Sequence, residues 1–406
     1  MFLRTFKLSL LFSFYWAASC MVYSYAERFL LHYGFSTGEI GLVIAIAYLA
    51  AMILEPVLAQ EADRGTRISL KSGITACAVF AVLLTLFTPV AKRMLPLLAV
   101  LFGAMTCVTL GMQPLVNAVG FHYLNRGETV DYSFSRGAAS IAYALSSLLL
   151  GYLASQNIDS ILWVYLAANV GLFLVALWFA PKRTEQTQKA TAGSVFSVIF
   201  RYPKLMLFCA GMLILNVPHV LINSYLASIT GVTGGNMSVM IAIAAIVEFP
   251  AMMAYTHIRK KISDRVLLIV SSCFYLLKTG LLALAAYFSV GAWAVYVSSA
   301  TQMLCYAIFI PASSFFANDS VSRADQVKGQ MLLTETTLCS GMISMLLGGL
   351  SIQKLGVPLT LLISEGFVLV GILIIATAVR TKNTSLSVFS NSILTQLWRL
   401  CFLCDV

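Results

Sequence analysis

Of the ionisable side chains inside long apolar stretches of this chain, five suggest a function by their chemistry: Arg136, His219, Glu248, Lys278 and Glu335. A charged group inside a membrane-spanning segment costs at least about 2.5 to 3.5 kcal/mol, so such groups usually face a wet cavity. The rigid fork of an arginine suits a carboxylate or adjacent hydroxyls. A carboxyl group in an apolar cavity can take up and release a proton. The set therefore predicts binding of a polar solute together with proton movement.

Two of these residues also have a purely structural interpretation. Arg136 lies only five residues beyond Asp131, close enough to a span end for its guanidinium to reach the membrane surface. His219 lies near a span end, where a single histidine is more often a hydrogen-bonded packing residue than a proton relay. We expect Arg136 to bind solute and keep His219 as a candidate for proton coupling.

The remaining ionisable residues raise a question of pairing. Glu248 is our main candidate for proton coupling, although it could instead hydrogen-bond the helix backbone that Pro250 frees. Lys278 needs a counter-charge inside the membrane. The sequence leaves Glu248 and Glu335 equally open as its partner, and both Lys278 and Glu335 stay candidates for coupling.

Aromatic residues crowd the first apolar stretch. Phe12, Tyr15, Trp16 and Tyr23 fall near one face of a helix by their spacing. Such a stripe either lines a cavity, as a stacking platform for a flat solute, or packs against other helices. We expect Tyr15, Trp16 and Tyr23 to contact substrate.

The elements that must position these residues are twelve apolar segments. The chain is 60% hydrophobic and 10% charged, whereas about a quarter of the residues in soluble domains are charged. A helix crosses about 30 Å of hydrocarbon with roughly 20 apolar residues. The sequence therefore predicts an all-α membrane protein with twelve transmembrane helices. The expected spans are 8–33, 38–60, 69–90, 94–123, 132–154, 160–180, 203–229, 235–257, 265–288, 291–316, 328–352 and 357–379.

Basic residues predict the orientation, because Lys and Arg favour cytoplasmic loops. With the N-terminus inside, most of the 26 Lys and Arg residues fall on cytoplasmic connections, and only Arg28, Lys92, Arg93 and Lys354 fall outside. We expect a multi-pass protein of the cell (cytoplasmic) membrane with both termini in the cytoplasm. The net charge of +10 is then a topology signal, and no nucleic-acid partner is expected.

The first apolar run and the cysteines each have an alternative interpretation. The run after Arg4 and Lys7 continues through Tyr25 without a small-residue cleavage pattern, so we interpret it as the first helix and not as a signal peptide. The nine cysteines are scattered and odd in number, which does not indicate a disulfide framework. Cys401 and Cys404 form a lone CxxC, a weak signal for metal or redox chemistry.

The chain divides in the middle into two similar parts. The polar segment 182–202 is expected to be a cytoplasmic linker between bundles at 1–181 and 203–380, and 381–406 a cytoplasmic tail. The loop EADRGTR (61–67) follows the second span, and RKKISDR (259–265) follows the eighth. Two six-span halves of like design are typical of transporters built from parallel repeats, with the site between the halves near the midplane.

With these loops the chain resembles the major facilitator superfamily. The ADRGTR segment is similar to the signature of that family between its second and third helices. The resemblance implies that Asp63, Arg64, Asp264 and Arg265 form a conformational switch, in which the two aspartates accept hydrogen bonds at helix N-termini and clamp neighbouring helix ends. The alternative is an ordinary capped turn.

A closer resemblance appears in DYSFSRGAASIAYALSSLLLG (131–151), which is similar to the fifth helix of the lactose permease and phenylpropionate permease branch. The resemblance implies that Arg136 and Tyr143 face the substrate. The sugar-binding glutamate of that branch falls at Asn117 if one residue is skipped to align Pro114. Asparagine cannot pair with Arg136 as an ion, which favours a carboxylate or another polar substrate over a disaccharide.

The second half resembles the same branch less completely. Glu248 is similar to its eighth-helix glutamate, Lys278 lies one position from a ninth-helix arginine, and His219 is similar to a seventh-helix histidine. The segment 302–306 reads QMLCY where the branch would carry a histidine. If that histidine carries protons elsewhere, coupling here must use Glu248 or Glu335, or be absent.

These observations predict a secondary transporter working by alternating access. It would move a small polar or anionic organic solute, with protons as the expected coupling ion, and it would act in the lipid bilayer as a monomer. No cofactor or metal is expected, because the chain has no GxxxxGK[ST], HExxH or GxSxG segment; an enzyme is therefore disfavoured. The alternatives are efflux of drugs or metabolites by proton antiport and a receptor that does not transport.

Overall fold

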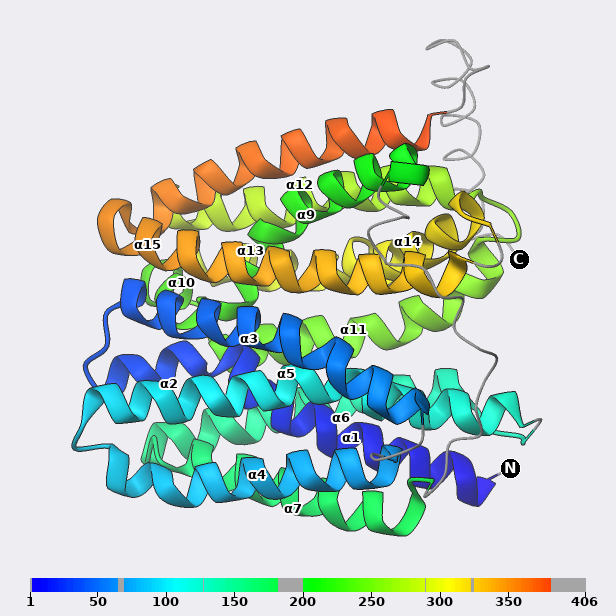
Figure 1. The fold of residues 1–406 in the computed structure, drawn as a ribbon. Helices are drawn as coiled ribbons and strands as arrows, with labels where there is room; N and C mark the ends of the chain where they lie inside the picture. The colour runs from blue at the N-terminus through cyan, green and yellow to red at the C-terminus, as the bar shows by residue number, and fades with distance from the viewer. Residues whose placement is uncertain are drawn as a thin grey trace.

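The computed structural model describes residues 2–64, 69–126, 128–181, 200–288, 290–322 and 325–380, and every regular element among them is a helix. The first half contains α1 (Phe2–Ser24), α2 (Ala26–His32), α3 (Thr37–Arg64), α4 (Leu70–Ala91), α5 (Leu95–Asn125), α6 (Tyr132–Gln156) and α7 (Ser160–Phe179). The second half contains α9 (Pro203–Ser224), α10 (Leu226–Thr233), α11 (Met237–Ile258), α12 (Asp264–Phe288), α13 (Ala292–Ala300), the 3-10 turn η1 (Thr301–Met303), α14 (Tyr306–Ser320) and α15 (Gln326–Val379). The first half lies below the second in Figure 1.

The prediction of twelve crossings is confirmed. Within the described residues, eleven helices are long and apolar enough to span a membrane, and the last of them runs over 52 residues, Lys328–Val379. Such a length is more than twice the roughly 20 residues that one crossing needs. Gly356 interrupts it with a left-handed backbone (φ 77°), and the chain folds back at that point (Figure 1). The segment α15 therefore supplies two crossings.

Side-chain caps mark several of the points where a helix leaves a loop. Ser69 forms a capping box with Ser72 at the start of α4. Asp131 accepts a hydrogen bond from the Phe134 amide at the start of α6 (2.8 Å), and Asn236 accepts from two amides at the start of α11. These caps satisfy backbone donors that a helix end leaves unpaired.

Three crossings are broken helices. The first crossing breaks between α1 and α2 at Tyr25, and the seventh breaks between α9 and α10 at Tyr225. Both breaks follow a serine, and they lie at equivalent places in the two halves. The tenth crossing is interrupted by η1 between α13 and α14. Broken crossings are typical of transporter sites, because they expose backbone and side chains to a cavity.

Two seams join the halves: α3 packs against α15, and α6 packs against α11. Glycines allow the close approach in the first seam. A Cβ atom on Gly41 would lie 2.3 Å from the Met345 carbonyl oxygen, and one on Gly349 would lie 2.3 Å from the Thr37 carbonyl oxygen. Small residues at membrane helix contacts permit such backbone proximity.

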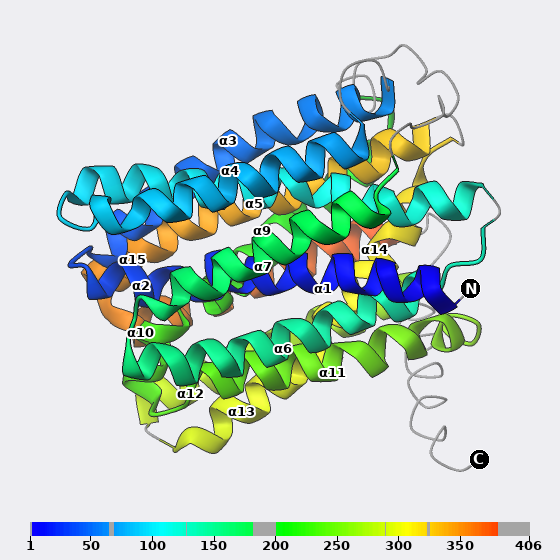
Figure 2. The same ribbon diagram turned by 90° about the horizontal axis from the view of Figure 1, so that it is seen from below.

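The bundle has two distinct ends (Figures 1 and 2). We call the end where α1 begins and α15 ends the terminus end. The opposite end, which holds α2, α10 and the fold of α15 at Gly356, is the far end. Most of the predicted linker and all of the predicted tail lie outside the described residues, as do Cys401 and Cys404.

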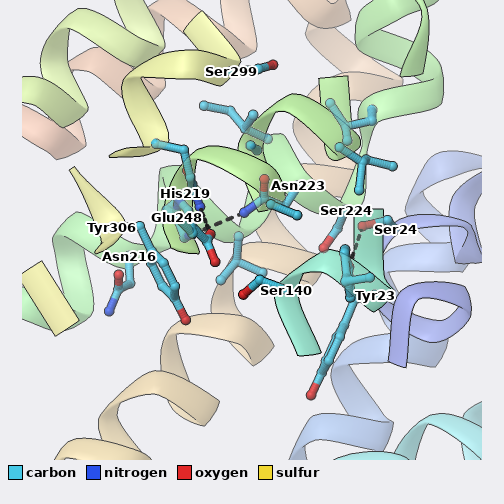
Figure 3. A pocket seen from close by; sticks show the side chains of 18 of the residues that line it. Tyr23, Ser24, Ser140, Asn216, His219, Asn223, Ser224, Glu248, Ser299 and Tyr306 are labelled. Carbon is cyan, nitrogen blue, oxygen red and sulfur yellow. Dashed lines mark hydrogen bonds between the residues drawn. The ribbon is translucent and has the colours of Figure 1, made fainter. Parts of the chain in front are cut away.

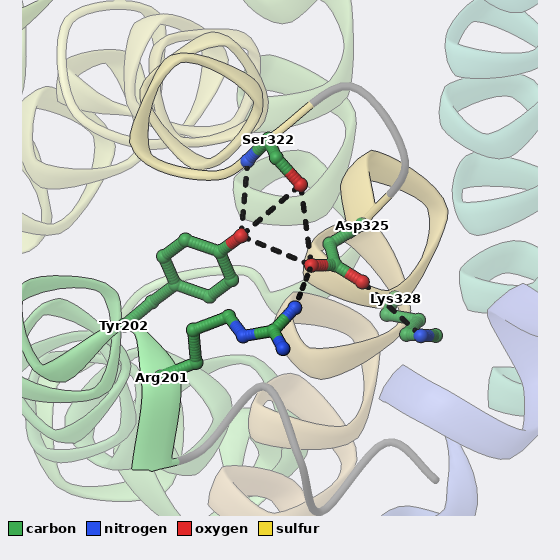
Figure 4. A network of polar contacts seen from close by, with 5 residues as sticks. All are labelled: Arg201, Tyr202, Ser322, Asp325 and Lys328. Carbon is green, nitrogen blue, oxygen red and sulfur yellow. Dashed lines mark hydrogen bonds and ion pairs between the residues drawn. The ribbon is translucent and has the colours of Figure 1, made fainter. Parts of the chain in front are cut away.

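A polar network at the terminus end fixes the start of α9 to the turn before α15 (Figure 4). Tyr202 Oη and Arg201 Nη1 donate to Asp325 Oδ2 at 3.0 and 3.3 Å, and Lys328 Nζ donates to Asp325 Oδ1 at 3.1 Å. Ser322 Oγ adds a hydrogen bond of 3.2 Å. The hydrogen bonds from Lys328 and Tyr202 hold the pKa of Asp325 below its usual range.

The first half carries a similar connection at the same end. Arg4 of α1 forms an ion pair of 3.0 Å with Glu128, and Thr5 Oγ1 accepts a hydrogen bond from the Asp131 amide at 3.1 Å. Each half thus ties its first helix to the loop before its fifth crossing. The two halves therefore resemble each other in this connection as well as in the loops 61–67 and 259–265.

We expect Asp325→Asn to lower the melting temperature of the purified protein at pH 7, because the asparagine cannot receive the ion pairs from Arg201 and Lys328. The pKa of Asp325 is depressed, so its contribution is complete above the unfolded pKa of about 3.9 and is lost as the pH falls through the folded pKa. The difference between variant and wild type should therefore shrink below about pH 4. Thermal unfolding in detergent checks both points. Asp319→Asn, an exposed acid on α14, is the control; a difference that does not change with pH would contradict the assignment.

Candidate functional site

A cavity of about 230 Å³ lies between the two halves and takes side chains from both. Figure 3 shows Tyr23 and Ser24 of the first half on one side, and His219, Asn223 and Glu248 of the second half facing them. The polar and aromatic residues that line it are Trp16, Tyr23, Ser24, Tyr48, Gln113, Arg136, Ser140, Tyr143, Asn216, His219, Asn223, Ser224, Glu248, Lys278, Ser298, Ser299, Gln302, Tyr306 and Thr337. A cavity between two halves with convergent polar groups is the usual form of a solute site.

Arg136 enters the cavity from α6 and rests on an aromatic ring. Its guanidinium carbon lies 4.3 Å from the centroid of the Trp16 ring, and Nη1 lies 3.5 Å from Ser140 Oγ. No carboxylate forms an ion pair with Arg136 among the residues that the structure describes. Stacking on tryptophan stabilises the cation. It does not use the N–H groups of the guanidinium, which can therefore donate hydrogen bonds to a solute. The arrangement can receive an anionic or hydroxyl-bearing solute.

The aromatic wall beside Arg136 is held by contacts within the first half. Trp16 packs against Tyr143 with ring centroids 6.1 Å apart and against Tyr23 at 6.4 Å. Tyr143 Oη and Ser24 Oγ are hydrogen-bonded at 2.8 Å, and Tyr23 Oη donates to Gln113 Oε1 at 3.4 Å. The Nε1 atom of Trp16 is buried and has no hydrogen-bond acceptor among the described residues.

The second half supplies a chain of three polar side chains. Lys278 Nζ donates to Gln302 Oε1 at 2.6 Å, and Gln302 Nε2 donates to Glu248 Oε1 at 2.8 Å. Lys278 and Gln302 are only 2% and 3% exposed. A lysine can only donate, so it fixes the orientation of the amide, and the amide then presents its N–H groups to Glu248. The positive charge is thereby linked to the carboxylate through a neutral spacer.

This chain decides between the pairings that the sequence left open. Lys278 reaches Glu248 through Gln302, and no contact joins it to Glu335 in the described structure. Glu335 is half-buried on α15 and does not line the cavity.

Gln302 owes its place to the break in the tenth crossing. It lies in η1, where the helix axis is interrupted between α13 and α14. Just after the break, Tyr306 turns its ring onto His219, with centroids 4.8 Å apart and planes 14° apart. A 3-10 turn inside a helix often marks a functional hinge. The sequence predicted no role for Gln302, which stood out only as part of the segment 302–306 that lacks the histidine of the family pattern.

His219 and two amide residues form the wall on α9. Asn223 Nδ2 lies 3.1 Å from His219 Nε2, while His219 Nδ1 and both amide atoms of Asn216 are buried without a hydrogen-bond partner among the described residues. Unpaired buried polar groups are costly, so a bound solute or water would stabilise them. Asn216, His219 and Asn223 follow i, i+3, i+7 spacing, a signal that could have found the two asparagines.

Several predicted site residues lie elsewhere. Tyr15 is fully buried and donates to the Thr109 carbonyl oxygen at 3.0 Å, because its position is rotated about 100° from Trp16 around the helix. Asn117 does not line the cavity; Gln113, one helical turn earlier on α5, does. A role for Asn117 in binding solute stays a prediction.

The predicted switch residues are only partly described. The side chains of Asp63 and Arg64 lie outside the described residues. Asp264, the first residue of α12, accepts from Tyr255 Oη at 2.5 Å and from Arg259 Nη2 at 2.9 Å. These bonds join the end of α11 to α12 within one half. Arg265 is exposed, and a role as a switch stays a prediction for all four residues.

Comparisons with known proteins agree with this arrangement. The model of the MFS_1 like family matches residues 5–362. No curated protein matches the chain.

Solved structures match over nearly the whole length. The nucleoside transporter NupG has 15% identity and a TM-score of 0.76, covering 93% of this chain and 100% of its own. A bacterial homologue of the human lysosomal transporter Spinster, inward-facing and unoccupied, has 13% identity and a TM-score of 0.65, covering 97% of each chain. At sequence identities of 15% and 13%, the structural similarity shows a shared fold and nothing more specific.

Proposed function

Because the chain belongs to the MFS_1 like family, we propose that it is a secondary transporter which moves a small polar or anionic organic solute together with a proton. Solved structures that share its fold include a nucleoside transporter and a bacterial homologue of a lysosomal transporter. Alternating access between the two halves would expose the cavity to each side of the membrane in turn. The basic-residue pattern supports a cytoplasmic-membrane orientation with both termini inside, and a monomer is sufficient for the cavity described.

The arrangement of Arg136 is the observation that carries this proposal. Its guanidinium lines the cavity, is stacked on Trp16, and has no described carboxylate partner. A carboxylate or a pair of hydroxyls on the solute would complete its bonding in a bidentate manner. The aromatic wall of Trp16, Tyr23 and Tyr143 suits a solute with a flat or apolar portion. These groups make a polar organic solute a better fit than a purely apolar one.

Glu248 is our choice for the proton-carrying group. It faces the cavity from the opposite half and is bound by Gln302, which Lys278 holds in one orientation. Protonation of Glu248 would remove a negative charge from the half that opposes Arg136. A solute bound between Arg136 and the second half would then favour one of the two arrangements of the halves only while Glu248 is protonated. His219 stays a second candidate, while Glu335 lies outside the cavity.

The resemblance to the lactose permease and phenylpropionate permease branch is retained as a proposal. It is supported by Arg136, Tyr143 and Glu248, which all line the cavity. NupG is named as a nucleoside transporter, so nucleosides belong in any substrate panel beside aromatic acids, sugars and short carboxylates. We also propose the division into bundles at 1–181 and 203–380.

The proposal predicts that external pH will rise when the right solute is added. The test uses lightly buffered, de-energised cells that express the protein, to which each compound of the panel is added down its gradient. Alkalinisation with one compound and not with its neighbours is expected, because a proton enters with the solute. Control cells carry the empty vector. Silence across the panel, with the protein present in the membrane, would contradict proton-coupled uptake.

Arg136→Lys should weaken binding of that solute by about tenfold to a hundredfold, because an ammonium group cannot make the paired bonds of the guanidinium fork. Binding is measured by calorimetry on purified protein. Arg4→Lys, which alters a surface ion pair with Glu128 at the terminus end, is the matched control and should bind as the wild type does. An unchanged affinity in Arg136→Lys would exclude Arg136 from solute recognition.

Glu248→Gln should separate solute movement from proton movement. The amide keeps the shape of the side chain but cannot be deprotonated, so accumulation against a gradient should fall to equilibration while solute exchange across the membrane continues. Radiolabelled uptake and counterflow in proteoliposomes measure the two activities. Glu365→Gln is the control, since Glu365 is an intramembrane acid of α15 outside the cavity. Full accumulation by Glu248→Gln would remove Glu248 from the proton path.

A further inference from the structure

Glu27 is a buried acid that the proposed function does not use. It lies in α2 at the far end, it is 0% exposed, and it does not line the cavity. No lysine or arginine forms an ion pair with it among the described residues. A buried carboxylate normally needs a cation or several hydrogen-bond donors, so the partners of Glu27 indicate its role.

The partners of Glu27 all come from the other half of the molecule. Glu27 Oε2 accepts from the Ala227 amide at 2.8 Å, and the Ser228 amide lies 3.2 and 3.3 Å from its two oxygens. Ser228 Oγ also contacts Oε1. Every one of these groups is a donor, which matches an acceptor-only carboxylate.

These donors belong to the first turn of α10. The break of the seventh crossing at Tyr225 creates a new helix N-terminus there, and that N-terminus has no side-chain cap from its own half. The free amides and the helix dipole favour a negative charge at this point. Glu27 therefore caps a helix of the opposite half.

The contact has no counterpart in which the second half supplies the carboxylate. The breaks at Tyr25 and Tyr225 are equivalent, but the position that corresponds to Glu27 in the second half is Ala227. The first half supplies the carboxylate, and the second half supplies the helix end. The contact exists only while α2 and α10 lie together.

Other hydrogen bonds between the halves gather in the same region. Tyr25 Oη is bonded to Ser238 Oγ at 2.8 Å, Ser147 Oγ donates to the Ser238 carbonyl at 3.1 Å, and Thr37 Oγ1 donates to the Gly349 carbonyl at 3.1 Å. All of these residues lie toward the far end of their helices. Among the described residues, the inter-half hydrogen bonds are those of Glu27 and these three.

We infer that Glu27 is the latch that holds the far end of the transporter closed by capping α10 across the two halves. Alternating access, as proposed above, requires the far end to open, and opening separates the carboxylate from its donors. Of these inter-half hydrogen bonds, only those of Glu27 involve an ionisable group, and hydrogen bonds to an ionised carboxylate are the stronger kind. Its loss should therefore shift the balance between closed and open states more than loss of a neutral contact.

The test measures distances at both ends of the purified protein, without substrate and without a proton gradient. Spin labels on His32→Cys and Val232→Cys report the far end, since both positions are exposed and lie on α2 and α10. Labels on Phe6→Cys and Lys204→Cys report the terminus end from α1 and α9. The background has its native cysteines replaced, and distance distributions are recorded by double electron–electron resonance.

In Glu27→Ala we expect the ratio of far-end-open to far-end-closed molecules to rise about tenfold or more, as loss of a charge-assisted contact implies. The terminus-end pair should move closer in the same fraction of molecules, because the halves rock as bodies. Glu39→Gln is the matched control. Glu39 is also an acid at a helix start of the far end, but it binds only Ser36 of its own half.

Glu27→Gln keeps the side-chain volume and carries the test if the alanine variant does not purify as a folded protein; a smaller shift in the same direction is expected. Wild-type distances in both variants would overturn the inference. So would a longer far-end distance without a change at the terminus end, because that result means local unfolding of α2 or α10. Neither result depends on the substrate panel. Unchanged distances would overturn the role of Glu27 without contradicting the proposed function. Absence of a pH change across the panel would contradict proton-coupled uptake without contradicting the role of Glu27.

Discussion

A polar side chain inside a membrane bundle has no bulk water to satisfy it, and this constraint organises the centre of the molecule. Lys278 and Glu248 are too far apart to pair directly in the described structure, and Gln302 fills the gap between them. That position is available only because η1 interrupts the tenth crossing. The positions of α11, α12 and the broken tenth crossing are thus tied to one hydrogen-bonded chain.

The two halves meet this constraint in different ways. The second half links its cation to a carboxylate through the Gln302 amide, whereas the first half places Arg136 on the face of Trp16 without an anion among the described residues. The shared fold of the halves therefore carries unlike chemistry on its two inner faces. In the proposed transport cycle, a solute between them would contact a cation on one side and a carboxylate on the other, and this asymmetry would let binding and protonation favour the same rearrangement.

Small residues and broken helices shape the surface between the halves. Gly41 and Gly349 bring the backbones of α3 and α15 into contact, so this seam is held by shape more than by polar bonds. The breaks at Tyr25 and Tyr225 produce short helices that meet across the interface at the far end. A close-packed interface has few intermediate arrangements, which suits a molecule that alternates between two states.

The sequence by itself determined the crossings, because each membrane helix satisfies its own backbone and needs only a local apolar run. Even the last two crossings, which form one long element here, were separated correctly around Gly356. It also selected most of the charged and aromatic residues of the cavity, because a charged side chain in an apolar span is stable only where it faces other polar groups or water. These residues are Trp16, Tyr23, Arg136, Tyr143, His219, Glu248 and Lys278. Only the tertiary structure decided that Lys278 bonds to Gln302, that Tyr15 and Asn117 do not line the cavity, and that Glu27 reaches α10. Those outcomes depend on the rotation and depth of each helix against its neighbours, which are set by contacts between residues far apart in the chain.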